Sequence, residues 1–158
     1  MGNKASGKGC ILRFRGKYSF LSNFYPCEIE YEGKVYPSVE NAYQASKTAP
    51  HRRDIFTRIS PKEAKKLGRK VPLLQGWEGR KVEIMEELVW KKFSGNPELR
   101  EKLLSTGDKI LIEGTTWGDE FWGVNLKKPD SESKYGYKGK NILGEILMKV
   151  REKLKEEK

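Results

Sequence analysis

Apolar residues recur at helical spacing along most of this chain, and strand-like runs are confined to a few short stretches. Residues 11–14 and 28–36 have the pattern of strands, and the turn at Gly33 divides the second run into a predicted hairpin. We expect helices over residues 37–47, 51–59, 60–68, 77–93 and 96–107, and a last helix that begins at Asn141. Residues 110–112 are typical of a short buried strand or a connector. This pattern predicts an α+β fold, predominantly α-helical, with a small N-terminal β-sheet or hairpin.

Capping residues mark several of the predicted helix boundaries. Ser38 follows a proline at the start of the first helix, where a side-chain oxygen can accept from free backbone N–H groups. Ser60 and Glu63 form a capping box around Pro61, which predicts a helix start at that proline. Residues 123–141 are polar and contain several glycines, so they predict a surface loop or a mobile lid.

The length of 158 residues is enough for one domain with its own hydrophobic core. We expect a flexible segment over residues 1–10, a folded domain over residues 11–154 and a charged tail over residues 155–158. No apolar run has the length of a membrane span and no signal sequence is recognisable, which favours a soluble, cytoplasmic protein. Met1 to Ser6 match the Met-Gly-x-x-x-Ser pattern of N-myristoylation. Residues that remain from an expression vector would explain this segment equally well.

The composition excludes several kinds of catalytic centre. His51 is the one histidine, so a histidine-based triad is not expected and a site with several histidine ligands is excluded. Cys10 and Cys27 form neither a CxxC pair nor a disulfide framework, which fits a reducing compartment. If the chain is an enzyme, carboxylates, lysines and aromatic rings must therefore carry the chemistry, and we expect no metal and no cofactor. The net charge of +10 favours polyanionic partners such as nucleotides or nucleic acid.

Three polar residues of the first predicted helix lie on one face. Glu40, Gln44 and Lys47 follow each other at i, i+4 and i+7, while Tyr43 falls on the apolar side. Spacing alone leaves two interpretations open. The stripe is either an ordinary solvated face, or Glu40 is a functional carboxylate that faces a pocket.

Two further segments are too aromatic for ordinary loops. In residues 18–26, the rings of Phe20 and Phe24 are expected to fill the core, while Ser22 and Asn23 could offer polar contacts at a pocket rim. In residues 116–123, two tryptophans, two glycines and a carboxylate occur together, which suits a nucleobase or a ribose next to a base. At the start of the last helix, Asn141 and Gly144 could leave N–H groups free for an anion, or Gly144 could serve close packing.

Six segments of the chain, taken in order, resemble the NADAR (YbiA-like) family of N-glycosidases. They are Phe-Leu-Ser-Asn-Phe-Tyr at 20–25, Pro-Ser-Val-Glu-Asn-Ala-Tyr-Gln-Ala at 37–45, Ala-Lys-Lys-Leu-Gly-Arg at 64–69, Trp77 with Lys81 and Met85, Asp-Glu-Phe-Trp-Gly at 119–123, and Gly-Lys-Asn-Ile-Leu-Gly-Glu-Ile-Leu-Met at 139–148. The resemblance extends over almost the whole chain. Asn41 departs from it, since some members have histidine there.

The resemblance implies a hydrolase that cleaves the N-glycosidic bond at C1 of a phosphorylated ribose. The implied substrates are phosphoribosylamino-pyrimidine intermediates of riboflavin biosynthesis, or ADP-ribose attached to guanine, including guanine in a nucleic acid. It assigns catalysis to Glu40, Lys81 and Asp119. The expected substrate-binding residues are Arg13, Ser22, Asn23, Phe24, Tyr43, Gln44, Arg69, Trp77, Trp117, Trp122, Gly123, Asn141 and Gly144.

The chemistry of such a reaction fits these side chains. Breaking a ribose–nitrogen bond builds positive charge at C1, which a carboxylate can stabilise while it orients water. We assign this role to Glu40, with Asp119 as a second carboxylate or a ligand of the ribose hydroxyls, and expect both at one cavity beside Trp122. Lys81 could attack an opened ribose as an amine or assist the departing base. Arginines, among them Arg13, Arg15 and Arg69, would hold phosphates.

Two functions of other classes remain open from the sequence. The chain could be a non-catalytic domain that binds ADP-ribose or an NAD-like ligand in the same aromatic pocket. It could also be a nucleic-acid-binding module that depends on the positive net charge.

Overall fold

A computed structural model of the protein describes residues 9–157, which form two compact units. One unit is the continuous stretch from Asn23 to Pro97, and the other joins the residues up to Ser22 with those from Glu98 onward. The predicted myristoylation pattern, Met1 to Ser6, lies outside the described residues.

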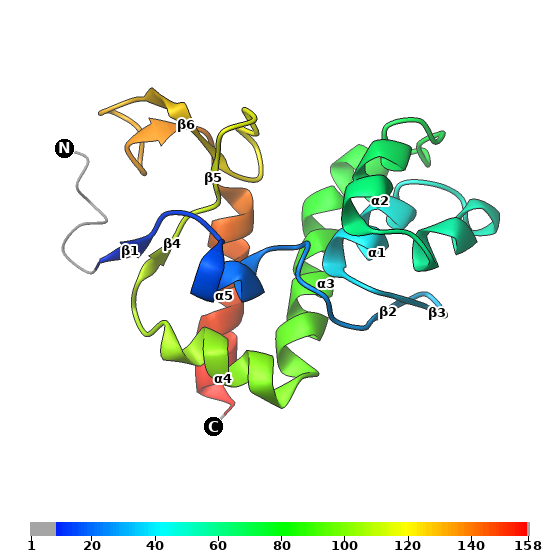
Figure 1. Ribbon diagram of the computed structural model, residues 1–158, viewed down its shortest axis with the longest axis horizontal. Helices are drawn as coiled ribbons and strands as arrows, with labels where there is room; N and C mark the ends of the chain where they lie inside the picture. Colours follow the sequence, from blue (N-terminus) through cyan, green and yellow to red (C-terminus); the bar gives the residue numbers. More distant parts are fainter. Residues whose placement is uncertain (1–8, 158) are drawn as a thin grey trace. The chain divides into compact units, whose positions relative to one another are not determined.

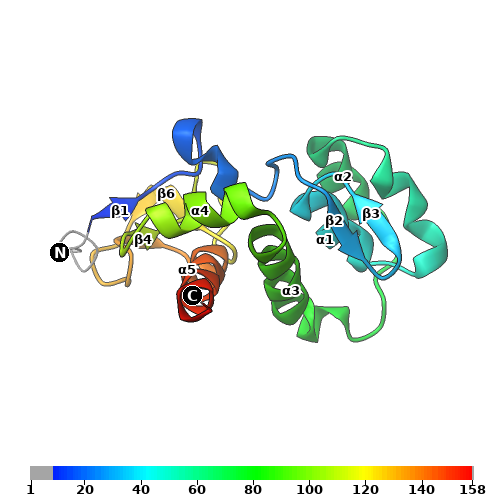
Figure 2. The same cartoon turned by 90° about the horizontal axis from the view of Figure 1, so that it is seen from below.

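The continuous unit is mostly helical and contains one hairpin (Figures 1 and 2). Its elements are the strands β2 (Ile29–Tyr31) and β3 (Lys34–Tyr36), the helices α1 (Val39–Ser46), α2 (Pro61–Gly68) and α3 (Lys81–Ser94), and the 3-10 turns η3 (Pro50–Arg52), η4 (Asp54–Thr57) and η5 (Trp77–Gly79). Helix α1 packs against both α2 and α3. All eight residues of α1 are buried, so this helix forms the centre of the unit.

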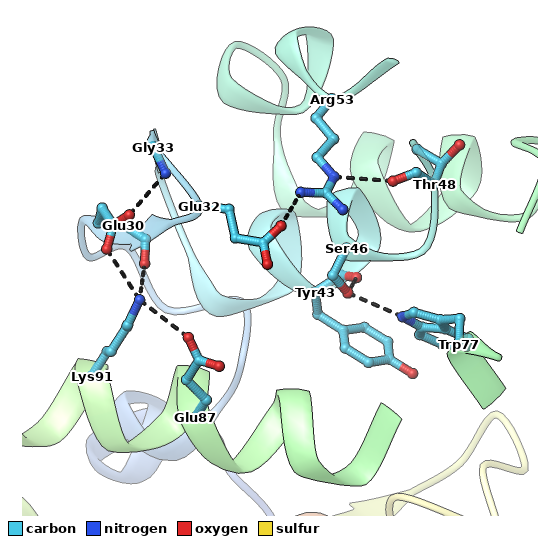
Figure 3. A network of polar contacts seen from close by, with 10 residues as sticks. All are labelled: Glu30, Glu32, Gly33, Tyr43, Ser46, Thr48, Arg53, Trp77, Glu87 and Lys91. Carbon is cyan, nitrogen blue, oxygen red and sulfur yellow. Dashed lines mark hydrogen bonds and ion pairs between the residues drawn. The ribbon is translucent and has the colours of Figure 1, made fainter. Parts of the chain in front are cut away.

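The predicted hairpin is confirmed, and it is anchored at both ends. Strands β2 and β3 pair antiparallel with Ile29 opposite Tyr36, and the turn places Glu32 and Gly33 at positive φ. The Lys91 ammonium of α3 donates to the backbone oxygen of Glu30 at 2.7 Å and to its carboxylate at 3.1 Å (Figure 3). The hairpin is therefore held against α3 by charge-assisted hydrogen bonds.

A buried arginine fixes the other side of the hairpin turn. Arg53 donates from Nη1 to the Glu32 carboxylate at 2.7 Å and from Nε to the Thr48 backbone oxygen at 3.0 Å (Figure 3). Residues 51–59, predicted as one short basic helix, instead form the two 3-10 turns η3 and η4. The Arg53 side chain connects the residue Thr48, which follows α1, to the hairpin. This connection does not require a regular helix over residues 51–59.

Capping predicted two helices of this unit well. Ser38 caps α1 by accepting from the Asn41 N–H, and the Ser60–Glu63 capping box of α2 is present in both directions. The helix predicted over residues 77–93 is interrupted, because η5 ends at Gly79 and α3 begins only at Lys81. Lys81 therefore lies in the first turn of a helix.

The second unit contains both helices and short strands. Its elements are β1 (Cys10–Ile11), the 3-10 helix η2 (Gly16–Leu21), α4 (Pro97–Ser105), β4 (Ile110–Leu111), β5 (Gly114–Thr115), β6 (Val124–Pro129), β7 (Tyr137–Lys138) and α5 (Ile142–Glu156). Strand β1 pairs parallel with β4, and β5, β6 and β7 form a three-stranded sheet. Figure 1 shows β1 beside β4 and the sheet next to the first turn of α5.

The loop or mobile lid predicted over residues 123–141 is wrong, because strands β6 and β7 occupy much of it. Lys127, Lys128 and Pro129 of β6 are exposed, so the sequence carries little sign of burial there. The sheet is held instead by Val124 and Tyr135, which pack with Ile112 into a small apolar cluster. A few buried residues therefore hold β6 in the sheet, although the polar composition of this segment predicts a loop.

Helix α5 supplies the main core of this unit. The periodicity predicts a buried stripe of Ile142, Ile146, Val150 and Leu154, of which the last three are buried. Leu143 and Leu147 are buried as well. Arg151 donates to the Thr106 hydroxyl at 2.7 Å and to the Lys109 backbone oxygen at 2.9 Å, which ties α5 to the end of α4.

The predicted α+β class, rich in helix with small sheets, is confirmed. Beyond the predicted hairpin, strands also occur after residue 110. Within residues 9–157, no helix has both the length and the apolar character needed to cross a membrane.

Candidate active site

The residues predicted for the site divide between the two units. The continuous unit contains Asn23, Phe24, Glu40, Tyr43, Gln44, Arg69, Trp77 and Lys81, and the other contains Arg13, Ser22, Trp117, Asp119, Trp122, Gly123, Asn141 and Gly144. The expectation that Glu40 and Asp119 share a cavity joins the two groups and stays a prediction. Each group has a definite internal geometry.

Glu40 is a buried carboxylate, with 7% of its surface exposed, and Gln44 is 4% exposed. The interpretation of these residues as a solvated stripe is therefore wrong. Gln44 Nε2 donates to Glu40 Oε2 at 2.6 Å, a short bond that follows from the i,i+4 spacing on α1. Because a buried carboxylate is costly unless it is hydrogen-bonded, this bond helps to keep Glu40 in place.

Gln44 itself occupies a space that a glycine of α2 leaves open. A Cβ atom at Gly68 would lie 1.8 Å from Gln44 Oε1, so no larger residue fits there unless Gln44 moves. Since Nε2 faces the Glu40 carboxylate, the orientation of the amide is fixed and Oε1 remains a buried acceptor without a hydrogen-bond partner. Gln44, predicted to bind substrate, thus contacts the candidate carboxylate directly.

Aromatic side chains and a lysine follow at the C-terminal end of α1. Figure 3 shows Tyr43, Ser46 and Trp77 there. Tyr43 and Trp77 are buried with ring centroids 5.4 Å apart, and the Trp77 indole N–H donates to the Ser46 hydroxyl at 3.2 Å. The Lys47 ammonium lies over both rings, 5.7 Å from the centroid of Tyr43 and 5.5 Å from that of Trp77. Trp77 and Tyr43 thus hold a cation in the same unit as Glu40.

Charged groups from four elements influence the Lys47 ammonium. Burial lowers the pKa of Lys47, Arg69 and Lys81 act in the same direction, and Glu40 and Glu78 oppose the shift. Lys81, a predicted catalytic residue, forms an ion pair with Glu78 at 2.9 Å. Lys81 therefore belongs to the same electrostatic cluster as Glu40, and its ammonium form has a carboxylate partner.

The segment before the hairpin contributes the two predicted rim residues. The Asn23 backbone oxygen accepts from the Glu40 N–H at 3.0 Å, and its side-chain amide contacts the Met85 sulfur at 3.5 Å. Phe24 is 40% exposed, so its expected place in the core is wrong, and its ring lies 6.0 Å from the Lys65 ammonium. An exposed ring at this position remains compatible with a role in binding substrate.

Asn41 of α1, where this chain departs from the family resemblance, donates to the backbone oxygens of Phe56 and Ile59.

In the other unit, Asp119 organises its own loop. Its Oδ1 accepts from the N–H groups of Phe121 at 3.0 Å and Trp122 at 2.9 Å, and its own N–H donates to the Thr115 hydroxyl. This arrangement leaves Asp119 partly exposed and places half-buried Trp122 directly after the turn. The carboxylate therefore has a structural role, whatever chemistry it performs.

The start of α5 is closed rather than open to a ligand. The N–H groups of residues 140–143 donate to the backbone oxygens of Glu120, Gly123, Phe121 and Trp122, so the expectation of free N–H groups here is wrong for these four. Asn141 is fully buried at φ 53°, where it donates to the Leu111 oxygen and accepts from the Glu113 N–H. A Cβ at Gly144 would lie 2.1 Å from the Leu111 oxygen, and one at Gly123 would lie 2.2 Å from the Glu113 oxygen. These residues hold the backbone together.

Three predicted residues of this unit keep more of their surface. Trp117 is 60% exposed, Trp122 packs edge-on against Phe121 with centroids 4.9 Å apart, and Arg13 has a buried Nε without a hydrogen-bond partner. Ser22 ends η2, where its N–H donates to the Ser19 oxygen. Exposed Trp117 is the side chain here that is most open to a ligand.

The structure adds three residues to the candidate site that were not predicted there: Lys47, Gly68 and Glu78. Lys47 has a visible signal, since it shares the i, i+4, i+7 face with Glu40. Gly68 looked only like a helix end, and its contact with Gln44 depends on how α1 and α2 pack. Among residues 9–157, no cluster of three or more histidine, cysteine or acidic side chains could hold a metal ion.

The sequence of this chain is similar to those of several known N-glycosidases. The chain is 37% identical over 145 residues to the N-glycosidase Npun_R5314 of Nostoc punctiforme, covering 87% of this chain and 86% of that protein. It is also 37% identical over 145 residues to the N-glycosidase YbiA of Escherichia coli K12, covering 89% and 84%. The riboflavin biosynthesis protein VVA0006 of Vibrio vulnificus is 38% identical over 143 residues, which are 88% of this chain but 36% of that longer protein.

A solved structure and a family model lead to the same assignment. The NMR structure of the E. coli protein YbiA matches with a TM-score of 0.76 at 31% identity, over 99% of this chain and 94% of that one. The family model of the NADAR domain matches residues 13–155, so it includes most of both compact units. The chain therefore belongs to the NADAR family, whose relatives named above include N-glycosidases.

Proposed function

We propose that this protein is an N-glycosidase that hydrolyses the bond between C1 of a phosphorylated ribose and a nitrogen of a base. The observation that carries the proposal is the buried, hydrogen-bonded Glu40 carboxylate beside Tyr43, Trp77 and a group of cations. A negative charge with little access to water stabilises a developing sugar cation more strongly than an exposed one does. Glu40 would lie below C1 and orient the attacking water.

Lys81 and Asp119 would take supporting roles. Lys81 is held by its ion pair with Glu78 at 2.9 Å, and its ammonium would donate a proton to the departing base. Attack of the Lys81 amine on an opened ribose is the other hypothesis, and borohydride trapping of an adduct tests it, because the adduct must disappear in Lys81→Ala. Asp119, with one oxygen committed to its loop, would use the other for ribose hydroxyls.

Two substrate classes fit this chemistry. One is a phosphoribosylamino-pyrimidine intermediate of riboflavin biosynthesis, which the name of the Vibrio relative supports. The other is ADP-ribose attached to guanine, free or within a nucleic acid, which the net charge of +10 favours. Both require cleavage at C1 of a ribose that carries phosphate, and we expect the protein to act in the cytoplasm.

Release of free base from both substrates tests the proposal. Wild type should release base from at least one of them, and Glu40→Gln should lose about 10²- to 10⁴-fold in turnover while it still binds the ligand. Glu83→Gln is the matched control, because that carboxylate lies on the exposed surface of α3. A protein that only binds ADP-ribose would release no base and would be indifferent to Glu40→Gln.

A further inference from the structure

Three basic side chains of the continuous unit come from the ends of three different helices. Lys47 follows α1 as its C-cap, Arg69 is the C-cap of α2, and Lys81 is the first residue of α3. The charges of Arg69 and Lys81 both act on the Lys47 ammonium, so the three groups lie close enough to interact. The backbone supports this arrangement, because the Leu74 N–H donates to the Lys47 oxygen at 2.7 Å and fixes the connection between Arg69 and α3.

In contrast to Lys81, which is paired with Glu78, Lys47 forms no ion pair within residues 9–157. It is half-buried on the faces of Tyr43 and Trp77, and its burial is the largest influence on the group. Two carboxylates act on it, but Glu78 is paired with Lys81 and Glu40 accepts from Gln44. Three cations therefore face two carboxylates that already have partners. A partly buried cation in this situation is stabilised when an anion binds.

We propose that Lys47, together with Arg69, binds the phosphate group of the ribosyl substrate. This inference rests on the proposed function and states which part of the substrate these two helix ends recognise. The Arg69 guanidinium offers paired N–H donors to phosphate oxygens, and the Lys47 ammonium adds a point charge. The Tyr43 and Trp77 rings hold the Lys47 side chain in position before the ligand arrives, which reduces the entropy lost on binding.

The assignment differs from the one that the sequence suggested. The arginines expected to hold phosphate were Arg13, Arg15 and Arg69, and only Arg69 belongs to this cluster. Placing the phosphate at Lys47 sets it on the same helix as the Glu40 carboxylate, two turns away along α1. The spacing of about 10 Å between residues seven apart on a helix suits a ribose with phosphate at one end and C1 at the other.

Binding of ribose 5-phosphate and of ribose to the full-length protein, measured by NMR titration, tests this inference without turnover. Wild type should bind ribose 5-phosphate roughly ten- to hundred-fold more tightly than ribose, as expected for charge-assisted hydrogen bonds. Lys47→Met should reduce this preference to a few-fold and leave the affinity for ribose unchanged, while Lys47→Arg should keep most of it. Lys62→Met is the matched control, an exposed lysine of α2 whose loss should change nothing.

Several results would overturn the inference. They are a wild type without preference for ribose 5-phosphate, a Lys47→Met protein that keeps the full preference, and a borohydride-trapped adduct located on Lys47. If Lys47→Met does not fold, Lys47→Gln provides the same comparison with a shorter polar side chain. The proposed function fails separately: Glu40→Gln would then release base as wild type does, whereas it should keep the phosphate preference in either case.

Discussion

The position of the Glu40 carboxylate depends on a glycine in a neighbouring helix. Gln44 holds Glu40 through a 2.6 Å hydrogen bond, and the Gln44 amide lies where a side chain at Gly68 would be. Gly68 has no unusual backbone conformation, so the reason for glycine here is space alone. Gln44 is therefore a positioning residue for Glu40, and Gly68 is what allows it to take that place.

Gly68→Ala tests this dependence. The new methyl group must displace Gln44 from Glu40, so we expect kcat to fall roughly ten- to hundred-fold with little change in the affinity for ribose 5-phosphate. Steady-state kinetics and the NMR titration measure the two quantities. Gly79→Ala is the control, because nothing lies within 4 Å of a Cβ atom at Gly79. Equal kinetics for Gly68→Ala and wild type would show that Glu40 does not need Gln44.

A second buried charge affects stability rather than the site. Lys92 of α3 is 2% exposed, its ammonium lies 5.6 Å from the ring centroid of Tyr25 and 5.0 Å from that of Phe93, and it interacts with the Cys27 thiol. Burial lowers the pKa of Lys92 from 10.5 to about 8. The charged Lys92 ammonium therefore lowers the free energy of unfolding at neutral pH, since each unit of pKa shift corresponds to about 1.4 kcal/mol.

Lys92→Met should therefore stabilise the protein at pH 7, by about 2–3 kcal/mol. Between pH 8 and about pH 10.5 the unfolded wild type binds more protons at this lysine than the folded protein, so its free energy of unfolding rises with pH and the advantage of methionine shrinks. Urea unfolding of both proteins at pH 7 and pH 9.5 measures the difference. Both proteins carry Cys27→Ala in this comparison, because burial raises the pKa of the Cys27 thiol and the Lys92 charge opposes that shift. A difference independent of pH would contradict this account.

At the scale of elements, the first turn of α5 is tied to β4 by one side chain. Asn141 bridges the Leu111 oxygen and the Glu113 N–H from a left-handed backbone conformation that asparagine tolerates better than most residues. Both backbone groups lose their partner when the amide is removed.

Asn141→Ala should lower the free energy of unfolding by about 3 kcal/mol, from two lost hydrogen bonds and a strained backbone. Thermal unfolding measures this loss. If Asn141 instead contacts substrate, as the sequence suggested, the variant would keep its stability and lose affinity for ligand.

Elements with local signals could be predicted, and those that depend on distant partners could not. Ser38, Ser60 and the Gly33 turn each announce a boundary within four residues, and the structure confirms all three. Strands β6 and β7 pack against Ile112, which lies outside residues 123–141, and the exposed lysines of β6 give no sign of burial in the sequence. The site follows the same rule, since the Glu40–Gln44 pair was visible in the i,i+4 spacing while Gly68 needed the packing of two helices.

At the scale of the whole molecule, the net charge of +10 bears on the choice of substrate. A mononucleotide contacts only a few basic groups, whereas a nucleic acid that carries ADP-ribose spreads many phosphates over the surface. Each phosphate neutralised by a lysine or arginine releases counterions, so affinity for a nucleic acid falls steeply with salt. Binding to a small ligand is screened much less strongly.

If the natural substrate is ADP-ribosylated guanine in a nucleic acid, kcat/KM for that substrate should fall steeply between 50 and 200 mM salt, by about ten-fold or more for a few phosphate contacts. The value for ADP-ribosylated guanosine as a free nucleoside should change several-fold less over the same range. Rates of base release at four salt concentrations provide both slopes. Equal salt dependences of kcat/KM for the two substrates would mean that the protein recognises only the ribosyl group at its site. The surface charge would then have no part in selecting the substrate.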